Sequence, residues 1–294
     1  MKRTGFFAIV GKPNVGKSTL LNAMLGEKIS IVSSKPQTTR TRITGILTKG
    51  DDQFVFLDTP GLHTPRTKLG SFMMKTASGV IGDVDACILV VESEPFVGAQ
   101  ERNIIEKISQ SEIPCVLVIN KTDRADAQKI AQTIQAYSAL CEFDSVIPIS
   151  ALKNSGVNIV LDECSKFLEE HPHLYPDDMI TDQPERQIAA EIIREKILRS
   201  TDREIPHGTA VVIEDFEDLD TLIKIRAEIM CEKNTHKGIL IGKHGDMLKQ
   251  IATWAREDME KFFGTKVYLN LWVKVKEKWR DSSTSLNNFG FNDE

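Results

Sequence analysis

The stretch Gly11-Lys12-Pro13-Asn14-Val15-Gly16-Lys17-Ser18 decides the fold. It follows an apolar run at residues 6–10 and precedes a segment of helical period at residues 17–25, so it predicts a glycine-rich turn between a strand and a helix. Such a turn lets backbone N–H groups and the helix N-terminus surround a phosphate. Lys17 can reach the β- and γ-phosphates, and Ser18 can ligate Mg²⁺. In this context a bare glycine-rich turn is the less favoured interpretation.

Further apolar runs alternate with segments of helical period as far as residue 172. Buried strands are predicted at residues 6–10, 54–57, 86–91, 115–119 and 145–149, and helices at 17–25, 68–81, 99–109, 125–140 and 157–170. The more polar run 42–49 reads as an edge strand paired with 54–57 across the Gly50-Asp51-Asp52 turn. This alternation predicts an α/β domain at residues 1–172, with the mostly parallel sheet of a P-loop NTPase.

Three polar motifs follow three of these strands. They are Asp58-Thr59-Pro60-Gly61, Asn120-Lys121-Thr122-Asp123 and Ser150-Ala151-Leu152-Lys153. Because open α/β sheets bind ligands at the carboxyl ends of their strands, the motifs are expected to gather around one ligand. Each motif alone is weak, but their order along the chain makes one strong signal.

With these loops the domain resembles the translation-factor-class GTPases. The resemblance implies that Asp123 accepts hydrogen bonds from guanine, Asn120 contacts the purine edge, Lys121 packs over the ring, and Ser150 and Ala151 close the pocket. Adenine would leave the Asp123 carboxylate unpaired, so GTP and GDP are favoured over ATP. The implied nucleotide-binding residues are Gly11, Asn14, Val15, Gly16, Lys17, Ser18, Thr19, Asp58, Asn120, Lys121, Asp123, Ser150, Ala151 and Leu152.

Two polar segments correspond to the switches of such a GTPase. The first is residues 33–42, where one threonine would ligate Mg²⁺ while the γ-phosphate is present. The sequence does not separate Thr38 from Thr39, and we favour Thr39. The second is residues 62–68. The expected metal ligands are therefore Ser18, Thr39 and Asp58, and the expected catalytic residues are Lys17, Thr39, Asp58 and Gly61.

Two residues bear on the rate of hydrolysis. Leu62 stands where Ras-like proteins carry a glutamine that orients the attacking water, so slow intrinsic hydrolysis is expected. Asn14 resembles the asparagine of relatives that use a bound K⁺ in place of an arginine finger. An asparagine that merely suits a turn is an equally good interpretation.

A second domain follows a segment that is rich in proline and acidic residues. Residues 173–184 are predicted to link the domains. Beyond them we expect a helix at 185–200, strands at 210–215 and 222–231, a helical turn at 237–241, a helix at 246–263 and a strand at 266–275. This order predicts a small α+β domain at residues 185–280. Residues 281–294 are expected to be a disordered tail, with docking through Leu286, Phe289 and Phe291 as the alternative.

The α-β-β-α-α-β order around Gly242-Lys243-His244-Gly245 resembles the type II KH domain. KH domains use such a loop to clamp about four unpaired nucleotides. The implied RNA-binding residues are Ile241, Gly242, Lys243, His244, Gly245 and Lys249, although His244 is equally well a solvated loop residue. Trp254 is assigned to the apolar core of this domain and Trp279 to its edge.

The charge of the chain differs between its two parts. The formal net charge of −5 argues against a nucleic-acid binder when it is taken for the whole chain. Residues 233–280, however, hold eleven basic and five acidic residues, which gives +6 there and leaves −11 elsewhere. This split is typical of a basic RNA-binding module on an acidic carrier.

Cysteine usage and hydropathy exclude other classes of protein. The five cysteines form no Cys-x-x-Cys pair, which argues against zinc and against a disulfide framework. No apolar run approaches the ~18 residues that span a bilayer. We therefore expect a protein of the reducing cytoplasm that is not integral to a membrane.

The pairing of the two domains resembles a family of bacterial GTPases that act in small-subunit ribosome assembly. The resemblance implies binding near the 3′ end of 16S rRNA, a partnership with the small (30S) ribosomal subunit, and possible peripheral association with the inner membrane. We expect a monomer. The alternatives are a GTPase subunit of an RNA-modification complex and a membrane-surface GTPase without an RNA role.

Overall fold

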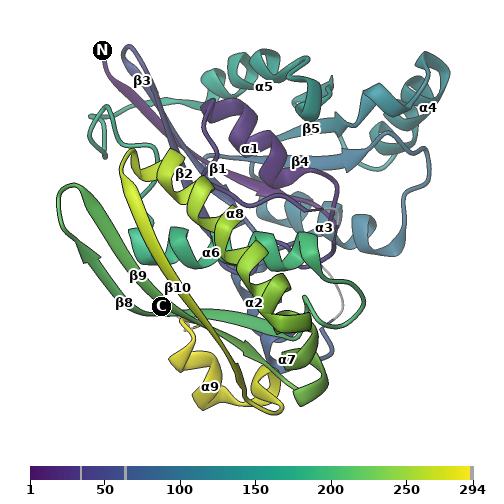
Figure 1. Ribbon diagram of the computed structural model, residues 1–294. Helices are drawn as coiled ribbons and strands as arrows, with labels where there is room; N and C mark the ends of the chain where they lie inside the picture. The colour runs from purple at the N-terminus through teal and green to yellow at the C-terminus, as the bar shows by residue number, and fades with distance from the viewer. Residues whose placement is uncertain (34, 63–64, 292–294) are drawn as a thin grey trace. The chain divides into compact units, whose positions relative to one another are not determined.

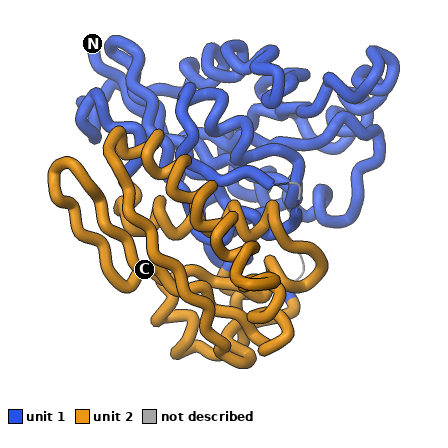
Figure 2. Tube along the Cα trace, in the orientation of Figure 1, with its two compact units in different colours: residues 1–65, 73–182 blue, residues 66–72, 183–294 orange. Residues whose placement is uncertain are grey.

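The chain forms two compact units. The structure, a computed structural model, describes residues 1–33, 35–62 and 65–291. Unit 1 comprises Met1–Pro65 and Met73–Asp182, and unit 2 comprises Arg66–Phe72 and Gln183–Glu294 (Figure 2). The division at residue 182 lies inside the segment predicted as the linker. The grouping of residues 66–72 with unit 2 was not expected from the sequence.

Unit 1 is built on a mostly parallel sheet. Its strands are β1 (Arg3–Val10), β2 (Ile43–Lys49), β3 (Asp52–Asp58), β4 (Ala86–Glu92), β5 (Cys115–Asn120), β6 (Ser145–Pro148) and β7 (Glu169–Glu170). They are ordered β2-β3-β1-β4-β5-β6, and β7 pairs with β1. The β2 strand is antiparallel to β3 and lies at the sheet edge, which confirms the predicted edge strand.

Helices cover both faces of this sheet (Figure 1). They are α1 (Lys17–Leu25), α2 (Lys68–Gly79, of which 68–72 group with unit 2), α3 (Ala99–Ser111), α4 (Ala127–Ser138) and α5 (Val157–Cys164), with short 3₁₀ turns η1 (Thr122–Arg124), η2 (Ala151–Lys153) and η3 (Ser165–Phe167). Ala8 and Val10 of β1 belong to one core cluster with Ile104 and Ile108 of α3. Since strand side chains alternate, the intervening residues face the other helical layer.

The predicted helix 157–170 is too long. It ends at Cys164, and residues 169–170 form β7, which is antiparallel to Arg3 and Thr4 of β1. The β4 strand pairs with β1 only from Phe7 onward, so the start of β1 is open on that side. Its backbone groups there need partners, and β7 supplies them.

The predicted linker lies along the sheet of unit 1. The backbone N–H groups of Leu174 and Tyr175 donate to Oε1 of Gln53 at 2.8 and 3.1 Å. Further on, the N–H of Ile46 in β2 donates to the carbonyl of Ile180 at 2.9 Å. An edge strand has unpaired backbone groups, and the segment after residue 173 satisfies some of them. Residues 173–182 are therefore part of unit 1 rather than a free connector.

Unit 2 has a three-stranded sheet with helices on one face. Its elements are α6 (Glu185–Ser200), β8 (Thr209–Asp218), β9 (Leu222–Cys231), α7 (Asn234–Ile241), η4 (Lys243–Gly245), α8 (Asp246–Phe263) and β10 (Lys266–Val275). The strand order is β10-β9-β8, with β10 parallel and β8 antiparallel to β9. The bounds predicted for α6, β9, α8 and β10 are confirmed. Ile225 and Ile229 of β9 pack with Ile193 of α6 and Ile251 of α8 in one core.

The expectation of a disordered tail is wrong for the described part of it. Residues Trp279–Asp281 form a 3₁₀ turn (η5) and Ser283–Asn288 form α9. Trp279 is fully buried and its Nε1 donates to the Gly208 carbonyl at 2.9 Å. The rings of Phe289 and Phe291 lie 5.4 and 6.1 Å from its ring. Phe289 and Phe291 of the tail thus pack on Trp279. Residues 292–294 lie outside the described residues.

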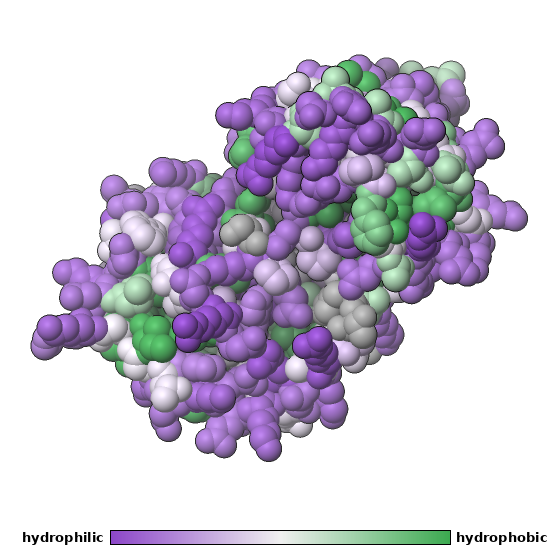
Figure 3. Space-filling view, turned by 90° about the vertical axis from the view of Figure 1, so that its right-hand side faces the viewer, coloured by the Kyte–Doolittle hydropathy of each residue, from purple (hydrophilic) through white to green (hydrophobic). Residues whose placement is uncertain are grey.

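Within the described residues, no helix combines the length and the apolar character that a membrane span requires. On the face drawn in Figure 3 hydrophilic residues predominate, and the hydrophobic ones form separate small patches.

Candidate nucleotide and nucleic-acid sites

The phosphate loop joins β1 to α1 in unit 1. Gly16 precedes α1 with φ 102°, and a Cβ there would lie 2.2 Å from Nδ2 of Asn120, so only glycine suits this position. Lys17 is 6% exposed, and its Nζ donates to the carbonyls of Gly11 at 3.2 Å and Lys12 at 2.9 Å. Burial lowers the pKa of Lys17 to about 8, against the opposing effect of the Asp58 charge. A phosphate in the loop would restore the charged form.

Three oxygen-bearing side chains meet beside this lysine. Ser18 Oγ donates to Asp58 Oδ2 at 2.6 Å and lies 2.9 Å from Thr39 Oγ1. Thr38 instead donates its hydroxyl to the Lys35 carbonyl at 2.6 Å. Of the two candidate threonines, Thr39 is therefore the one at the expected metal position.

The Asp58 carboxylate is suited to a bound cation. It is fully buried, and its Oδ1 has no hydrogen-bond partner among the described residues. Burial raises the pKa of Asp58, while Lys17 and the hydroxyls of Ser18, Ser30 and Thr39 oppose the rise. An unpaired buried oxygen is costly unless a ligand satisfies it, and carboxylate and hydroxyl oxygens are ligands that Mg²⁺ accepts. The residues present thus suit the ion.

The sequence did not predict that Ser30 belongs to this site. Its hydroxyl donates to Asp58 Oδ2 at 3.2 Å, but a lone serine in an apolar run carries no recognisable motif.

The base-binding motifs lie at the other end of the same cleft. Ser150 donates its hydroxyl to Asp123 Oδ1 at 2.6 Å, and this hydrogen bond holds the pKa of Asp123 below its usual range. Asp123 is therefore a fixed, ionised acceptor, as guanine recognition requires. Arg124 lies 3.9 Å from the same carboxylate.

Asn120 and Lys121 brace the loops around the cleft. Asn120 Nδ2 donates to the Val15 carbonyl at 2.8 Å, and its Oδ1 accepts the N–H of Ala151 at 3.0 Å. We expected Asn120 to contact the purine and Ala151 to close the pocket. In the structure the N–H of Ala151 donates to Oδ1 of Asn120 instead. The contact of Asn120 with the purine stays a prediction. Lys121 Nζ donates to the Asn14 carbonyl at 2.7 Å and pairs with Glu92.

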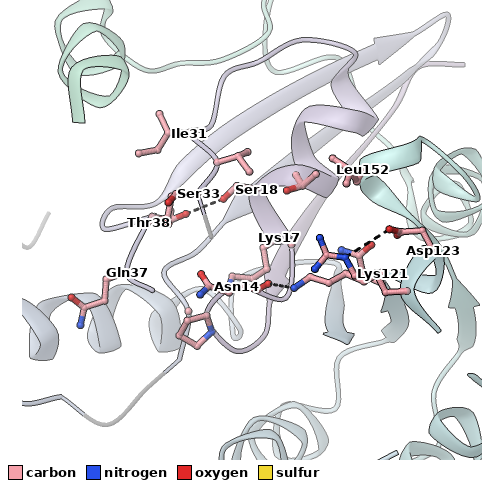
Figure 4. Close-up of a pocket in the computed structure, with 18 residues that line it drawn as sticks. Asn14, Lys17, Ser18, Ile31, Ser33, Gln37, Thr38, Lys121, Asp123 and Leu152 are labelled. Atoms are coloured by element: carbon pink, nitrogen blue, oxygen red, sulfur yellow. Dashed lines mark hydrogen bonds and ion pairs between the residues drawn. The ribbon is translucent and has the colours of Figure 1, made fainter. Parts of the chain in front are cut away.

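These groups surround a cleft of about 410 Å³ in unit 1 (Figure 4). The predicted residues that line it are Asn14, Gly16, Lys17, Ser18, Thr19, Thr39, Gly61, Asn120, Lys121, Asp123 and Leu152. Five others do not line it: Gly11, Val15, Asp58, Ser150 and Ala151. Ile31, Val32 and Arg124 line the cleft without having been predicted. Ile31 and Val32 directly precede the predicted first switch, and an apolar pair there is more typical of a buried core than of a binding site.

The residue after the Asp58–Gly61 motif points into the protein. Leu62 is buried in the core cluster of unit 1, and its N–H donates to the Gly11 carbonyl at 3.3 Å. It offers no polar group to an attacking water. Ser34 of the first switch and residues 63–64 of the second lie outside the described residues.

In unit 2 the Gly242–Gly245 loop joins α7 to α8. Gly242 has φ 75°, and a Cβ there would lie 2.7 Å from Cβ of Met247. The loop borders a groove of about 520 Å³ lined by Gly242, Lys243, Asp246, Met247, Lys249, Gln250, Thr253 and Trp254. Ile241, His244 and Gly245 flank this lining, and His244 has φ 53°. Trp254 is 40% exposed, so its assignment to the core is wrong. It follows the helical period of the core, and only the packing shows that it borders the groove.

Comparison with known proteins agrees with this architecture. Residues 6–121 match the family described as "50S ribosome-binding GTPase", and residues 204–280 match the KH domain family. The chain is 50% identical to GTPase Era of Clostridium kluyveri over 99% of its own length and 100% of that protein. It is 48% identical to GTPase Era of Ruminiclostridium cellulolyticum, with 98% and 97% covered.

The chain belongs to the Era family of GTPases. A crystal structure of Era in complex with MgGDPNP and nucleotides 1506–1542 of 16S ribosomal RNA is similar to it with a TM-score of 0.95 and 37% identity over 99% of both chains. An Aquifex aeolicus Era variant bound to GDP·AlF₄⁻ has a TM-score of 0.94 and 38% identity, with 98% of this chain and 99% of that one covered. The chain is thus a GTPase with a KH domain. Guanine nucleotide with Mg²⁺ suits its phosphate loop, the oxygen atoms of Ser18, Thr39 and Asp58, and the Asp123 carboxylate.

Proposed function

We propose that this Era-family GTPase is a GTP-dependent switch that binds the 3′ end of 16S rRNA through its KH domain and acts in small-subunit ribosome assembly. The observation that carries the proposal is the groove of unit 2, where Gly242 permits close approach of a backbone and Lys243, Lys249 and Trp254 offer charge and a stacking surface. A full-length relative holds nucleotides 1506–1542 of this RNA.

The cleft of unit 1 supports phosphoryl transfer through this chain's own residues. Lys17 offers its charge to the β- and γ-phosphates, and Ser18, Thr39 and Asp58 would hold Mg²⁺, which neutralises charge between those phosphates when bound. Gly61 lines the cleft, and its N–H would meet the γ-phosphate. Because Leu62 is buried and apolar, nothing at that position orients the water, and we expect slow hydrolysis in the free protein.

Asn14 is proposed as the residue through which K⁺ assists hydrolysis. It lines the cleft in a left-handed conformation with φ 66°, which asparagine adopts more readily than most residues, so a purely conformational role explains it equally well. Turnover compared in KCl and NaCl separates the two. A K⁺ role predicts faster hydrolysis in KCl that Asn14→Ala abolishes, whereas equal rates in both salts would contradict it.

We propose further that the protein works as a monomer in the cytoplasm and associates peripherally with the cytoplasmic face of the inner membrane. This part rests on the family resemblance alone. Sedimentation of the purified protein tests the first statement. Fractionation of cells at low and high salt tests the second, since a peripheral protein leaves the membrane fraction at high salt.

The RNA role is tested by substituting Gly242→Asp together with Gly245→Asp. Both positions have positive φ, and the new carboxylates would repel phosphates at the loop. We expect loss of binding to the 16S 3′-end RNA in a fluorescence anisotropy assay, with GTP hydrolysis unchanged. Unchanged RNA affinity in a folded double variant would contradict the proposal and favour the membrane-surface alternative. Crosslinking in cells to RNAs other than 16S would favour the RNA-modification alternative.

A further inference from the structure

The open face of the unit 2 sheet carries aromatic side chains that neither site uses. Val267, Leu271 and Val273 of β10 face the helices and belong to the core. Because strand side chains alternate, Tyr268 and Trp272 face the opposite way. Tyr268 is 58% exposed and Trp272 is 43% exposed. Two large aromatic rings exposed on one sheet face offer a ligand two flat stacking surfaces.

Cations surround these two rings. On β10 the same face holds Lys266 and Lys274. On β9 the register places Lys224 beside Tyr268 and Arg226 beside Asn270, between the two rings. We call this set the β10 strip: Lys224, Arg226, Lys266, Tyr268, Asn270, Trp272 and Lys274.

Two of the cations in the β10 strip are available to a ligand. Among the described residues, Lys224 and Arg226 make no ion pair within 4.0 Å, although the facing β8 residues are Glu217 and Asp215. The carboxylate within the aromatic part of the face, Glu228, is buried and already paired with Lys274. The β9–β10 half of the face is therefore basic, and Glu217 and Asp215 of β8 adjoin it as the cross-strand neighbours of Lys224 and Arg226.

We propose that the β10 strip is a second RNA-binding surface, on which unpaired bases stack on Tyr268 and Trp272 while phosphates contact Lys224 and Arg226. The inference rests on the proposed RNA-binding function and extends it beyond the Gly242–Gly245 groove. Stacking on exposed aromatic residues of a sheet is a general way to hold single-stranded RNA, because every base has a flat face. The β10 strand is the sheet edge and packs against α8, the helix that lines the groove (Figure 1).

A protein partner suits this surface less well. The cores of protein–protein interfaces are depleted of lysine and of charged residues in general, because buried charges without partners are costly. Burying the β10 strip would desolvate Lys224 and Arg226, neither of which forms an ion pair within 4.0 Å among the described residues. A phosphate backbone supplies the missing negative charge and leaves these side chains partly hydrated.

The test uses the full-length protein and two fluorescein-labelled single-stranded RNAs from the 16S 3′ end, one of about five nucleotides and one of about fifteen. The shorter RNA has the length that one KH groove holds. The test variant is Tyr268→Ala with Trp272→Ala. The matched control is Phe96→Ala, which removes a 78% exposed ring from unit 1. We expect the test variant to bind the longer RNA at least about tenfold more weakly and the shorter RNA within twofold of the parent.

A second variant, Lys224→Ala with Arg226→Ala, tests the phosphate contacts. We expect the slope of log affinity against log salt for the longer RNA to fall by about 1.4, at about 0.7 for each phosphate contact with a single strand. Unchanged affinity for the longer RNA in both double variants would overturn the inference while leaving the groove intact. If either double variant differs from the parent in sedimentation coefficient but not in RNA affinity, the β10 strip is a protein interface and the inference is overturned. Failure of the parent to bind either RNA would overturn the proposed function itself.

Discussion

At the scale of single residues, burial decides how the nucleotide site responds to pH. Lys17 and Asp58 are both buried, and burial shifts their pKa values in opposite directions. Neither shift is visible in the sequence, where both residues are simply members of motifs. In the nucleotide-free site burial therefore opposes the charged form of both groups, and phosphates and Mg²⁺ would favour those forms.

Nucleotide affinity is expected to fall as pH rises through about 8. Below that pH Lys17 is protonated in the free protein; above it, binding must first restore the proton because the phosphates favour the charged amine. Affinity should then fall by up to about tenfold for each pH unit between about 8 and the unperturbed pKa of about 10.4. Titration of a fluorescent GDP analogue between pH 7 and 9.5 measures this, and proton uptake by calorimetry in two buffers provides the control. Constant affinity with no proton uptake would contradict the prediction.

Asp123 is expected to determine the choice of base. Its carboxylate accepts hydrogen bonds from two guanine donors, whereas an amide at that position both accepts and donates. Asp123→Asn should therefore lower GTP affinity by about a hundredfold or more and raise affinity for xanthosine triphosphate, whose O2 accepts a hydrogen bond. Competition binding with GTP, ATP and xanthosine triphosphate measures this change in base preference. The matched control is Asp126→Asn, at the N-cap of α4. Equal loss of affinity for all three nucleotides would indicate misfolding instead.

At the scale of elements, sequence periodicity predicted the longer helices and strands well. It failed for short segments that form only because they pair with or pack against another element. The two residues of β7 have no pattern of their own and exist because the start of β1 is open on one side. The α9 helix has six residues, too short to be stable in isolation. It persists because Leu286 is buried and because Phe289 and Phe291 pack with Trp279. The formation of such short elements therefore depends on the residues they contact rather than on their own sequence pattern.

Removal of residues 282–294 is expected to destabilise unit 2. The deletion would expose the ring of Trp279, which is fully buried, and remove its contacts with Phe289 and Phe291. We expect a loss of about 2–4 kcal/mol in the free energy of unfolding, comparable with a large truncation in a core. Urea unfolding followed by tryptophan fluorescence measures it. Deletion of residues 292–294 alone is the control, and equal stability of the two truncated proteins would show that α9 contributes nothing.

At the scale of the whole molecule, the two units divide the work, and the basic segment is one part of unit 2. Residues 233–280 carry +6 and the remainder −11, and the nucleotide cleft and the RNA groove lie in different units. Residues 66–72, which overlap the predicted second switch, group with the KH-containing unit, where the N–H of Lys68 donates to Asp281 at 3.2 Å. This membership supports the hypothesis that the nucleotide state influences RNA binding.

RNA affinity is expected to differ between the GTP- and GDP-bound protein. A non-hydrolysable GTP analogue and GDP should give RNA dissociation constants that differ by about 5-fold or more, the lower end of usual coupling energies. By reciprocity, saturating RNA must change the ratio of analogue to GDP affinity by the same factor, which provides an internal control. Equal RNA affinity in the two nucleotide states would remove the coupling hypothesis.

The sequence by itself determined the two domains, the order of nearly all their elements and the position of the nucleotide loops. It could do so because phosphate loops and Gly-x-x-Gly turns act through backbone geometry that a short stretch encodes, and because α6, β9, α8 and β10 have strong periods. Only the tertiary structure showed that Thr39 rather than Thr38 lies beside Ser18. It also showed that both polar atoms of the Asn120 side chain form hydrogen bonds within the protein. The exposure of three aromatic residues likewise came from the structure alone: Trp254, Tyr268 and Trp272. The physical reason is that hydrogen-bond partners and exposure depend on residues far apart in the chain, which periodicity does not report.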